Sequence, residues 1–179
     1  EWLPATVPGT AASALRAAGK WDFQQPVDLD SNDWWFRTSF SVPDRPGNEP
    51  CSLCFDGLAG LAEVRFNGEV VLTTDNMFRS YRVDIGNLLR AENELVIVFR
   101  SLTADLKKRR PRPRWKTNLI SNQQLRWHRT SLLGRIPGWS PPVPAIGPWR
   151  DVRLECQAIQ FRELQRTATL EGAEGIVNF

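Results

Sequence analysis

Short segments in which polar and apolar residues alternate, separated by turn residues, restrict the fold more than any other feature. Residues 62–66 alternate in this way before Asn67-Gly68, a dipeptide typical of a type I′ turn because both of its positions require positive φ. Residues 69–73 form the predicted return strand of a hairpin. Further strands are predicted at residues 34–42, 51–55, 80–85, 94–100 and 149–156, with a weaker alternation at 158–170. Strands in close succession, without long helices between them, favour an all-β antiparallel sandwich over a βαβ fold.

Two short helices are predicted beside these strands. Thr10 can cap a helix that runs through the Ala-rich residues 11–18, and Gly19 stands where that helix should end. Residues 1–20 are therefore predicted to form a peripheral segment with a short helix. The second short helix is predicted near residues 122–129, inside a long loop.

Composition places the chain among ordinary folded domains. Its 179 residues are 41% hydrophobic and 24% charged, which suits one domain. No apolar run approaches the roughly 18 to 20 residues needed to cross a bilayer, so no membrane association is predicted. The chain opens at Glu1 without a signal-peptide pattern, so either a leader has been removed or the piece was cut from a longer protein. The end of the chain, from Gly172 onward, resembles an unfinished segment and favours truncation. The sequence indicates no cellular compartment.

The three cysteines are too few and too unevenly spaced for a disulfide scaffold. Cys51 and Cys54 have the spacing of half a zinc site, but His128 is the only histidine, and residues three apart on a strand face opposite sides. We predict buried thiols, at least one of them free because the count is odd, and neither a metal nor another cofactor. Asp75-Asn76 is interpreted as a turn rather than as part of a calcium site.

A basic region lies in the middle of the chain. Residues 106–150 contain no Asp or Glu but hold eleven of the 23 Lys and Arg residues. Residues 107–116 could neutralise phosphates while Trp115 stacks on a base, but the rest of the chain is acidic and carries no nucleic-acid-binding signature. Arg and Trp together also suit carbohydrate, because indole faces stack on sugar C–H faces and guanidinium groups donate to hydroxyls. Residues 106–148 are thus predicted to be a functional loop insertion.

Six short motifs occur in an order that resembles one known family. They are Trp34-Trp35-Phe36-Arg37-Thr38, Phe55-Asp56-Gly57-Leu58, Ala62-Glu63-Val64-Arg65-Phe66-Asn67-Gly68, Asp75-Asn76-Met77-Phe78-Arg79-Ser80-Tyr81, Asn93-Glu94-Leu95 and Gly147-Pro148-Trp149-Arg150-Asp151-Val152. The series is similar to the N-terminal sugar-binding domain of family 2 glycoside hydrolases, in particular the β-mannosidase branch. The resemblance implies a jelly-roll sandwich of galactose-binding-like topology over residues 1–157. It also implies that immunoglobulin-like domains and a TIM barrel with two catalytic glutamates follow in the parent protein. Residues 158–179 would then be the last strand of this domain or the start of an immunoglobulin-like one.

The same resemblance implies a role without catalysis for this segment. A retaining glycosidase needs two carboxyl groups about 5 to 5.5 Å apart. Glu63, Asp84 and Glu94 lie on predicted strands, where an outward, solvated position explains them. We therefore expect no catalytic residue and a loop that shapes the pocket for the non-reducing sugar of a β-glycoside. The expected partners are that carbohydrate and the downstream domains. Two alternatives stay open: a stand-alone carbohydrate-binding module, and a β-domain that binds polyanions or nucleic acid.

Two of the candidate sugar-binding residues rest on the resemblance, because the family has a Trp-Asp-Trp-Gly-Pro loop whose Trp and Asp are thought to line the sugar subsite. Counting back from Gly147, Trp139 matches the second Trp, while Gly138 stands where the Asp would be. Arg129 aligns with an Arg of the same family segment. The candidates taken together are Trp139, Arg129, Arg126, Trp127 and Trp115.

Two departures from the family pattern bear on specificity. The missing Asp removes an acceptor for sugar hydroxyls, which puts mannose specificity in question. Arg109, Arg112 and Arg114 make the loop more electropositive. The sequence therefore leads to the hypothesis that the glycan is anionic or otherwise modified.

Each candidate also has a structural alternative. Trp139 lies among four prolines and can pack on their rings to stiffen the loop. Trp127 and Leu125 can pack toward the interior beside the short helix. Arg126 and Arg129, three residues apart, would share one helical face and can pair with Asp or Glu.

Overall fold

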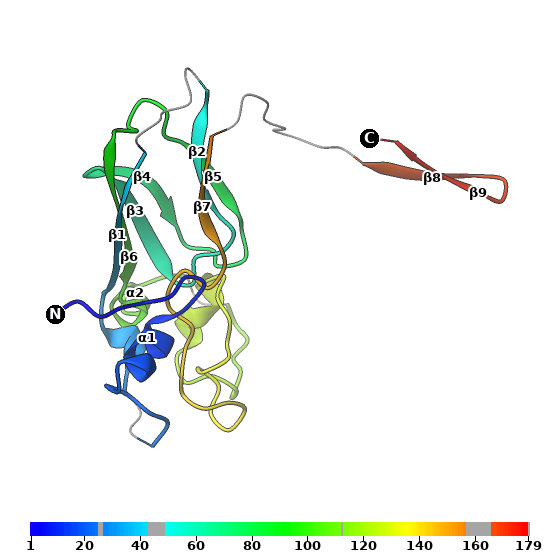
Figure 1. Ribbon diagram of the computed structural model, residues 1–179. Helices are drawn as coiled ribbons and strands as arrows, with labels where there is room; N and C mark the ends of the chain where they lie inside the picture. The colour runs from blue at the N-terminus through cyan, green and yellow to red at the C-terminus, as the bar shows by residue number, and fades with distance from the viewer. Residues whose placement is uncertain (25–26, 43–48, 112, 157–165, 179) are drawn as a thin grey trace.

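Two antiparallel sheets face each other in the computed structural model, which describes residues 1–24, 27–42, 49–111, 113–156 and 166–178 (Figure 1). The four-stranded sheet has the order β1-β6-β3-β4, formed by Trp34–Ser41, Glu92–Arg100, Leu61–Phe66 and Glu69–Thr74. The three-stranded sheet has the order β5-β2-β7, formed by Tyr81–Asp84, Cys51–Phe55 and Val152–Cys156. The predicted all-β antiparallel sandwich is confirmed.

The hydrophobic core lies between the two sheets, because alternate side chains of each strand point toward the facing sheet. In β3, Ala62, Val64 and Phe66 are buried and the residues between them are half-buried, which is the predicted alternation. The central strand β2 is buried along its whole length. Phe36 and Phe99 meet edge to face with ring centroids 5.5 Å apart, a favourable geometry for aromatic pairs.

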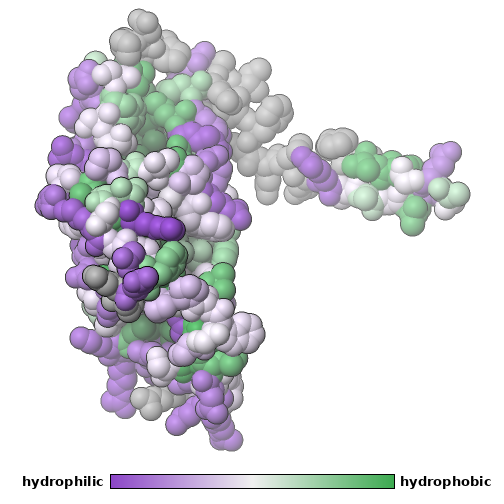
Figure 2. Space-filling view, turned by 60° about the horizontal axis from the view of Figure 1, so that its bottom comes forward, coloured by the Kyte–Doolittle hydropathy of each residue, from purple (hydrophilic) through white to green (hydrophobic). Residues whose placement is uncertain are grey.

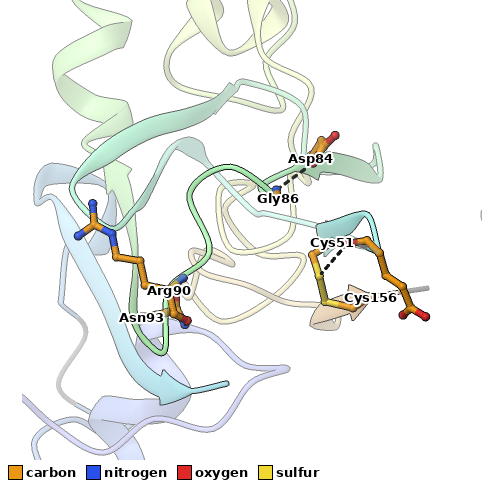
Figure 3. Close-up of a disulfide and its surroundings, with 7 residues drawn as sticks. Cys51, Asp84, Gly86, Arg90, Asn93 and Cys156 are labelled. Atoms are coloured by element: carbon orange, nitrogen blue, oxygen red, sulfur yellow. Dashed lines mark hydrogen bonds between the residues drawn. A yellow bond between two sulfur atoms is a disulfide. The ribbon is translucent and has the colours of Figure 1, made fainter. Parts of the chain in front are cut away.

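The predicted turn between β3 and β4 is confirmed, with φ of 50° at Asn67 and 90° at Gly68. The Asn67 side chain also joins this turn to the connection between β5 and β6. Its Nδ2 donates to the Leu88 carbonyl oxygen at 2.7 Å, and its Oδ1 accepts from the Glu94 N–H at 2.9 Å. Asn93 closes the same connection by bonding both backbone polar groups of Arg90, as the sticks in Figure 3 show.

Helical segments gather at one end of the sandwich (Figure 1). Helix α1, Ala11–Ala17, begins at the predicted cap Thr10, which exchanges hydrogen bonds with Ser13. The helix predicted near residues 122–129 is the shorter 3₁₀ helix η2, Gln123–Trp127. The sequence reading missed two short elements, the 3₁₀ helix η1, Leu29–Ser31, and the helix α2, Leu102–Leu106. No helix among the described residues is long and apolar enough to span a membrane.

The prediction of at least one free, buried thiol is confirmed for Cys54, but the prediction of a thiol at Cys51 is wrong. Cys51 and Cys156 form a disulfide across 105 residues of sequence, and Cys54 alone remains a buried free thiol. The bond forms because β2 and β7 pair in a register that places Cys51 directly opposite Cys156. Figure 3 shows the bridge joining these two strands. The residues that the structure describes contain no group of three or more His, Cys, Asp or Glu side chains that could hold a metal ion.

The last strands differ from the predicted ones. Strand β7 begins at Val152 rather than at Trp149, because its pairing with β2 starts at Val152 opposite Phe55, the last residue of β2. The Trp149 indole donates to the Met77 carbonyl oxygen at 3.0 Å. Residues 158–165 of the predicted strand 158–170 lie outside the described residues, as does the predicted domain boundary at 157 and 158. The remainder of that strand lies in β8, Thr167–Glu171, which pairs with β9, Glu174–Asn178. Strand β8 is exposed along its whole length.

Candidate functional site

The predicted loop insertion 106–148 is anchored by a small second hydrophobic cluster, which it shares with α2 and β3. Leu102, Ile120 and Leu125 are buried together. Leu61, Leu106 and Ile136 pack against them and are partly buried. A segment with little regular structure can hold side chains in fixed positions only through such contacts, since few backbone ladders stabilise it. The loop is therefore a structured extension at one end of the sandwich.

Arg135 ties the loop to the N-terminal part of the chain. Its Nε and Nη2 donate to the two carboxylate oxygens of Asp30, each at 2.7 Å, while Nη1 donates to the Ser131 carbonyl oxygen at 2.8 Å and to Thr130 Oγ1 at 3.2 Å. The Arg135 side chain is only 5% exposed. Asp30 lies in η1 beside Leu29, a core residue, so the fork pair fixes the loop to the sandwich.

Met77 provides a second attachment for the loop. Its N–H donates to the Arg129 carbonyl oxygen at 3.0 Å, and its Sδ accepts from the Ser131 N–H at 2.9 Å. Its own carbonyl oxygen accepts from Trp149 Nε1. Gly57 leaves room for that indole, because a Cβ at this position would lie 2.6 Å from Trp149 Nε1. These contacts set the position of the segment that carries Arg129.

Of the five candidate binding residues, the structure brings Trp115 and Arg126 into contact. The Arg126 guanidinium carbon lies 4.2 Å from the centroid of the Trp115 ring, a cation–π distance. Arg126 also donates to the Trp115 carbonyl oxygen at 3.1 Å and to Gln123 Oε1 at 2.7 Å. Pairing of Arg126 with an acidic side chain, the structural alternative to ligand contact, does not occur among the described residues, where Gln123 and the Trp115 indole hold this guanidinium.

The other three candidates present their side chains to solvent. Trp139 is 72% exposed and Trp127 is 45% exposed, while Leu125 beside it is buried. The interpretation of Trp127 as an inward-packing residue is therefore wrong, whereas that of Leu125 is confirmed. Arg129 is exposed too, and its side chain forms no ion pair with any residue that the structure describes. Exposed indoles and an unpaired guanidinium remain available to a ligand.

The exposed aromatic residues lie among unpaired cations. Lys108 and Arg110 both bind the buried Asp105, with N–O distances of 2.5 Å. By contrast, Arg109, Arg114 and Lys116 are exposed, without an ion pair to any described residue; Arg112 lies outside the described residues. Figure 2, which turns this end of the molecule toward the viewer, shows small apolar patches set among strongly hydrophilic residues. The end of the sandwich that carries the loop is thus both aromatic and electropositive.

The described carboxyl groups whose pKa is shifted do not suit general acid catalysis, which requires a raised pKa. A hydrogen bond from Arg65 holds the pKa of Glu63 below its usual range, and Arg100 adds to this effect. Every other described carboxyl group with a perturbed pKa is also shifted downward. Glu94 pairs with Arg37, and Asp84 accepts a hydrogen bond from the Gly86 N–H. These residues have structural partners rather than a catalytic geometry.

A cavity of about 630 Å³ lies elsewhere. It opens between the edge strands β1 and β7 and is lined mainly by apolar side chains, including Trp34, Phe36, Val152 and Leu154, and by residues 1–5. None of the five candidate residues lines it. Sugar sites combine an aromatic surface with several polar groups that fix orientation. On chemical grounds the exposed loop is therefore the better candidate site.

Sequence reasoning found the exposed residues but missed those that support them. Arg135 is one of eleven cations in the basic region, and no anchoring role was predicted for it, for Met77 or for Asp105. Nothing in the local sequence marks their roles, because their partners lie far away in the chain: Asp30 for Arg135, and residues 129–131 for Met77.

Two facing antiparallel sheets with a loop-bearing end make this domain a β-sandwich. Residues 1–150 match the family model described as glycosyl hydrolase 2 galactose-binding domain-like, and the chain belongs to this family. Over 91% of its length it is 32% identical to β-mannosidase B of Emericella nidulans, and over 88% it is 31% identical to β-mannosidase of Mus musculus. It spans only 21% and 20% of these two relatives, so it corresponds to about a fifth of each.

Solved structures support the same fold. The β-D-mannosidase of Dictyoglomus thermophilum aligns with 99% of this chain at a TM-score of 0.84 and 22% identity, over 23% of its own length. The exo-chitosanase of Amycolatopsis orientalis aligns with 96% of this chain at a TM-score of 0.65 and 21% identity, over 19% of its own length. The chain therefore has the fold of the non-catalytic domain of family 2 glycoside hydrolases that the sequence motifs predicted.

Proposed function

We propose that the chain serves as the sugar-contacting domain of a β-mannosidase-like retaining glycosidase whose catalytic residues lie elsewhere in the parent protein. The observation that carries the proposal is the pairing of family membership with an anchored loop whose Trp139, Trp127 and Arg129 face solvent. A loop without buried attachments would not present these side chains in fixed positions, whereas Arg135 and Met77 supply such attachments.

In the proposed mechanism the loop binds the sugar and the downstream barrel cleaves the bond. The indoles of Trp139 and Trp127 offer flat apolar faces for the C–H face of a pyranose, and Arg129 offers donors for hydroxyl oxygens. Arg126 and Trp115 are engaged with each other, so they act as one rigid edge of the surface. Holding the non-reducing sugar orients the glycosidic bond toward the catalytic carboxyl groups of the barrel.

The proposed domain boundary follows from the same proposal, in which further domains of the parent protein come after the sugar-contacting one. Residues 1–157 form the sugar-binding sandwich, and residues 158–179 begin an immunoglobulin-like domain that leads to the barrel. The exposure of β8 along its whole length supports this assignment, because a strand of this sandwich would bury one face. The hairpin β8–β9 would then be covered by strands that follow it in the parent protein.

The test of this function is the activity of the full-length protein against a panel of aryl glycosides. We expect hydrolysis of a β-mannoside, β-glucuronide or β-glucosaminide, and no hydrolysis of any of them by residues 1–179 alone. The β-glucuronide, the anionic member of the panel, also tests the anionic-glycan hypothesis, which the unpaired Arg109 and Arg114 support. Failure of the full-length protein to hydrolyse any of these substrates would refute the proposal.

A second candidate function is that of a polyanion-binding module, favoured by the same exposed and unpaired cations. Neutralising several phosphates would make the affinity depend steeply on salt. Titration with a single-stranded oligonucleotide at two salt concentrations tests this alternative. Micromolar binding that weakens steeply with salt would favour it over the sugar site, and no binding at low salt would dismiss it.

A further inference from the structure

His128 lies between two of the candidate sugar-binding residues and is the only histidine in the chain. Its backbone is extended, with φ of −111° and ψ of 140°, and it follows directly on the 3₁₀ helix η2. The His128 side chain is 5% exposed, whereas Trp127 and Arg129 are both exposed. A buried imidazole thus lies between two exposed neighbours in the chain.

Asp105 of α2 is the group that His128 faces. His128 Nε2 lies 3.2 Å from Asp105 Oδ2, yet this buried nitrogen forms no hydrogen bond of good geometry with a described residue. Asp105 is itself fixed by Lys108 and Arg110. Burial pushes the pKa of Asp105 upward, but the hydrogen bonds from these two cations outweigh that effect, and the carboxylate stays charged. The imidazole therefore lies against a charged carboxylate that Lys108 and Arg110 hold in place.

Charged groups from several elements surround this imidazole. They are Asp105 of α2, Arg110 after α2, Asp75 after β4 and Arg135 of the loop. Lys108 reaches the same cluster through Asp105. Burial has the largest effect and lowers the pKa of His128 below its usual 6.5; the two arginines lower it further, and the two aspartates raise it only in part. His128 is consequently neutral at pH 7.

We propose that His128 is a positioning residue, whose neutral imidazole, seated against Asp105, holds residues 127–129 so that Trp127 and Arg129 face the sugar. The anchoring of the segment follows from the geometry alone, while its effect on the substrate rests on the proposed function. The backbone contact between Met77 and Arg129 holds one end of this segment, and His128 holds its middle.

The anchor responds to pH in a defined direction. A histidine whose pKa is lower in the folded state stabilises that state fully above its unfolded pKa of about 6.5. The stabilisation is lost as the pH falls through the lowered pKa, because the charged imidazole is better solvated when the segment opens. Each unit of lowering corresponds to about a tenfold change in the opening equilibrium. The segment is thus closed near neutral pH and opens in acid.

Hydrogen–deuterium exchange of amides 125–131 at about pH 5 and pH 8, corrected for intrinsic rates, tests the anchor. Two variants accompany the wild-type chain: His128→Gln, which can donate to Asp105 but does not titrate, and His128→Leu, which fills the space without a polar atom. In the wild type we expect protection to fall several-fold in acid. His128→Gln should stay protected at both pH values, and His128→Leu should be poorly protected at both.

The same chain offers an independent control. Because there is one histidine, its imidazole protons give a single set of NMR signals to titrate. The titration should place the pKa below 6.5, and Asp105→Asn should lower it further, because the attractive carboxylate charge is gone. Identical pH profiles of exchange for the wild type and His128→Gln would overturn the anchor, even if His128→Leu fails to fold.

Kinetics of the full-length protein with its best aryl glycoside separate this inference from the proposed function. His128→Leu should raise KM several-fold with a smaller change in kcat, and His128→Gln should restore KM. An unchanged KM in His128→Leu, combined with faster exchange, would refute the positioning role. If no glycoside is hydrolysed while exchange still follows His128, the proposed function fails and the anchor stands.

Discussion

Reduction of the disulfide between Cys51 and Cys156 is expected to destabilise the sandwich strongly. The bond joins residues separated by 105 positions. For a closed loop of roughly 100 residues, the entropy lost by the unfolded chain corresponds to about 4.7 kcal/mol at 25 °C. The two cysteines are direct neighbours in the register of β2 and β7, so no backbone movement offsets this gain. Since domains are stable by only about 5 to 15 kcal/mol, the reduced chain should be marginally stable.

Urea unfolding followed by tryptophan fluorescence measures this effect. With a slope of about 2 kcal/mol per molar urea, the loss corresponds to a midpoint lowered by about 2 M in the presence of a phosphine reductant. Cys54→Ala is the matched control, because the Cys54 thiol is buried but is not part of the disulfide. That variant should lose no more than a small packing contribution and should respond to the reductant as the wild type does.

Alkylation with mass detection checks the bond itself. The unfolded, non-reduced chain should take up one alkyl group, on Cys54, and three after reduction. Equal urea midpoints with and without reductant would refute the reasoning on the unfolded state. Three alkyl groups without reduction would show that the bond does not form.

Two further substitutions test how the loop and its neighbours are held. Arg135→Met leaves the mostly buried Asp30 carboxylate unpaired and should lower the free energy of unfolding in urea by about 3 kcal/mol. Arg65→Met removes a pair with a 40% exposed arginine and should lower it by less than about 1 kcal/mol. Equal losses would contradict the role of the buried pair between Arg135 and Asp30. Gly57→Ala should lower the free energy of unfolding by about 1 to 3 kcal/mol, because its Cβ displaces the Trp149 indole from its hydrogen bond. Gly175→Ala should show no such loss, because a Cβ there meets nothing within 4 Å.

The strands were predictable because their signals are local. The predicted strand 51–55 has the observed bounds of β2, period-two alternation predicted β3 within one residue, and the conformational demands of Asn67-Gly68 predicted the hairpin between β3 and β4. The short helices η1 and α2 were missed because three or five residues carry too little periodicity. Their position is set by contacts with distant segments. Ser101, the cap of α2, donates to the Asp30 carbonyl oxygen of η1.

The disulfide and the supports of the site could not be predicted for a related reason. Cys51 meets Cys156 only because two strands pair in one particular register, and register between distant strands leaves no mark in the local sequence. The exposed indole of Trp139 was found through a family motif. That this indole is 72% exposed could not be predicted, because the local sequence does not encode exposure.

The central claim, that the exposed loop surface binds the sugar, is tested most directly by Trp139→Ala in the full-length protein. Trp2→Ala is the matched control, because Trp2 is a similarly exposed indole that lines the cavity between β1 and β7 instead of the loop. Loss of a stacking contact of about 1.4 kcal/mol should lower kcat/KM for the best aryl glycoside about tenfold. Trp2→Ala should leave kcat/KM near the wild-type value. Equal kcat/KM for Trp139→Ala and the wild type would contradict the claim.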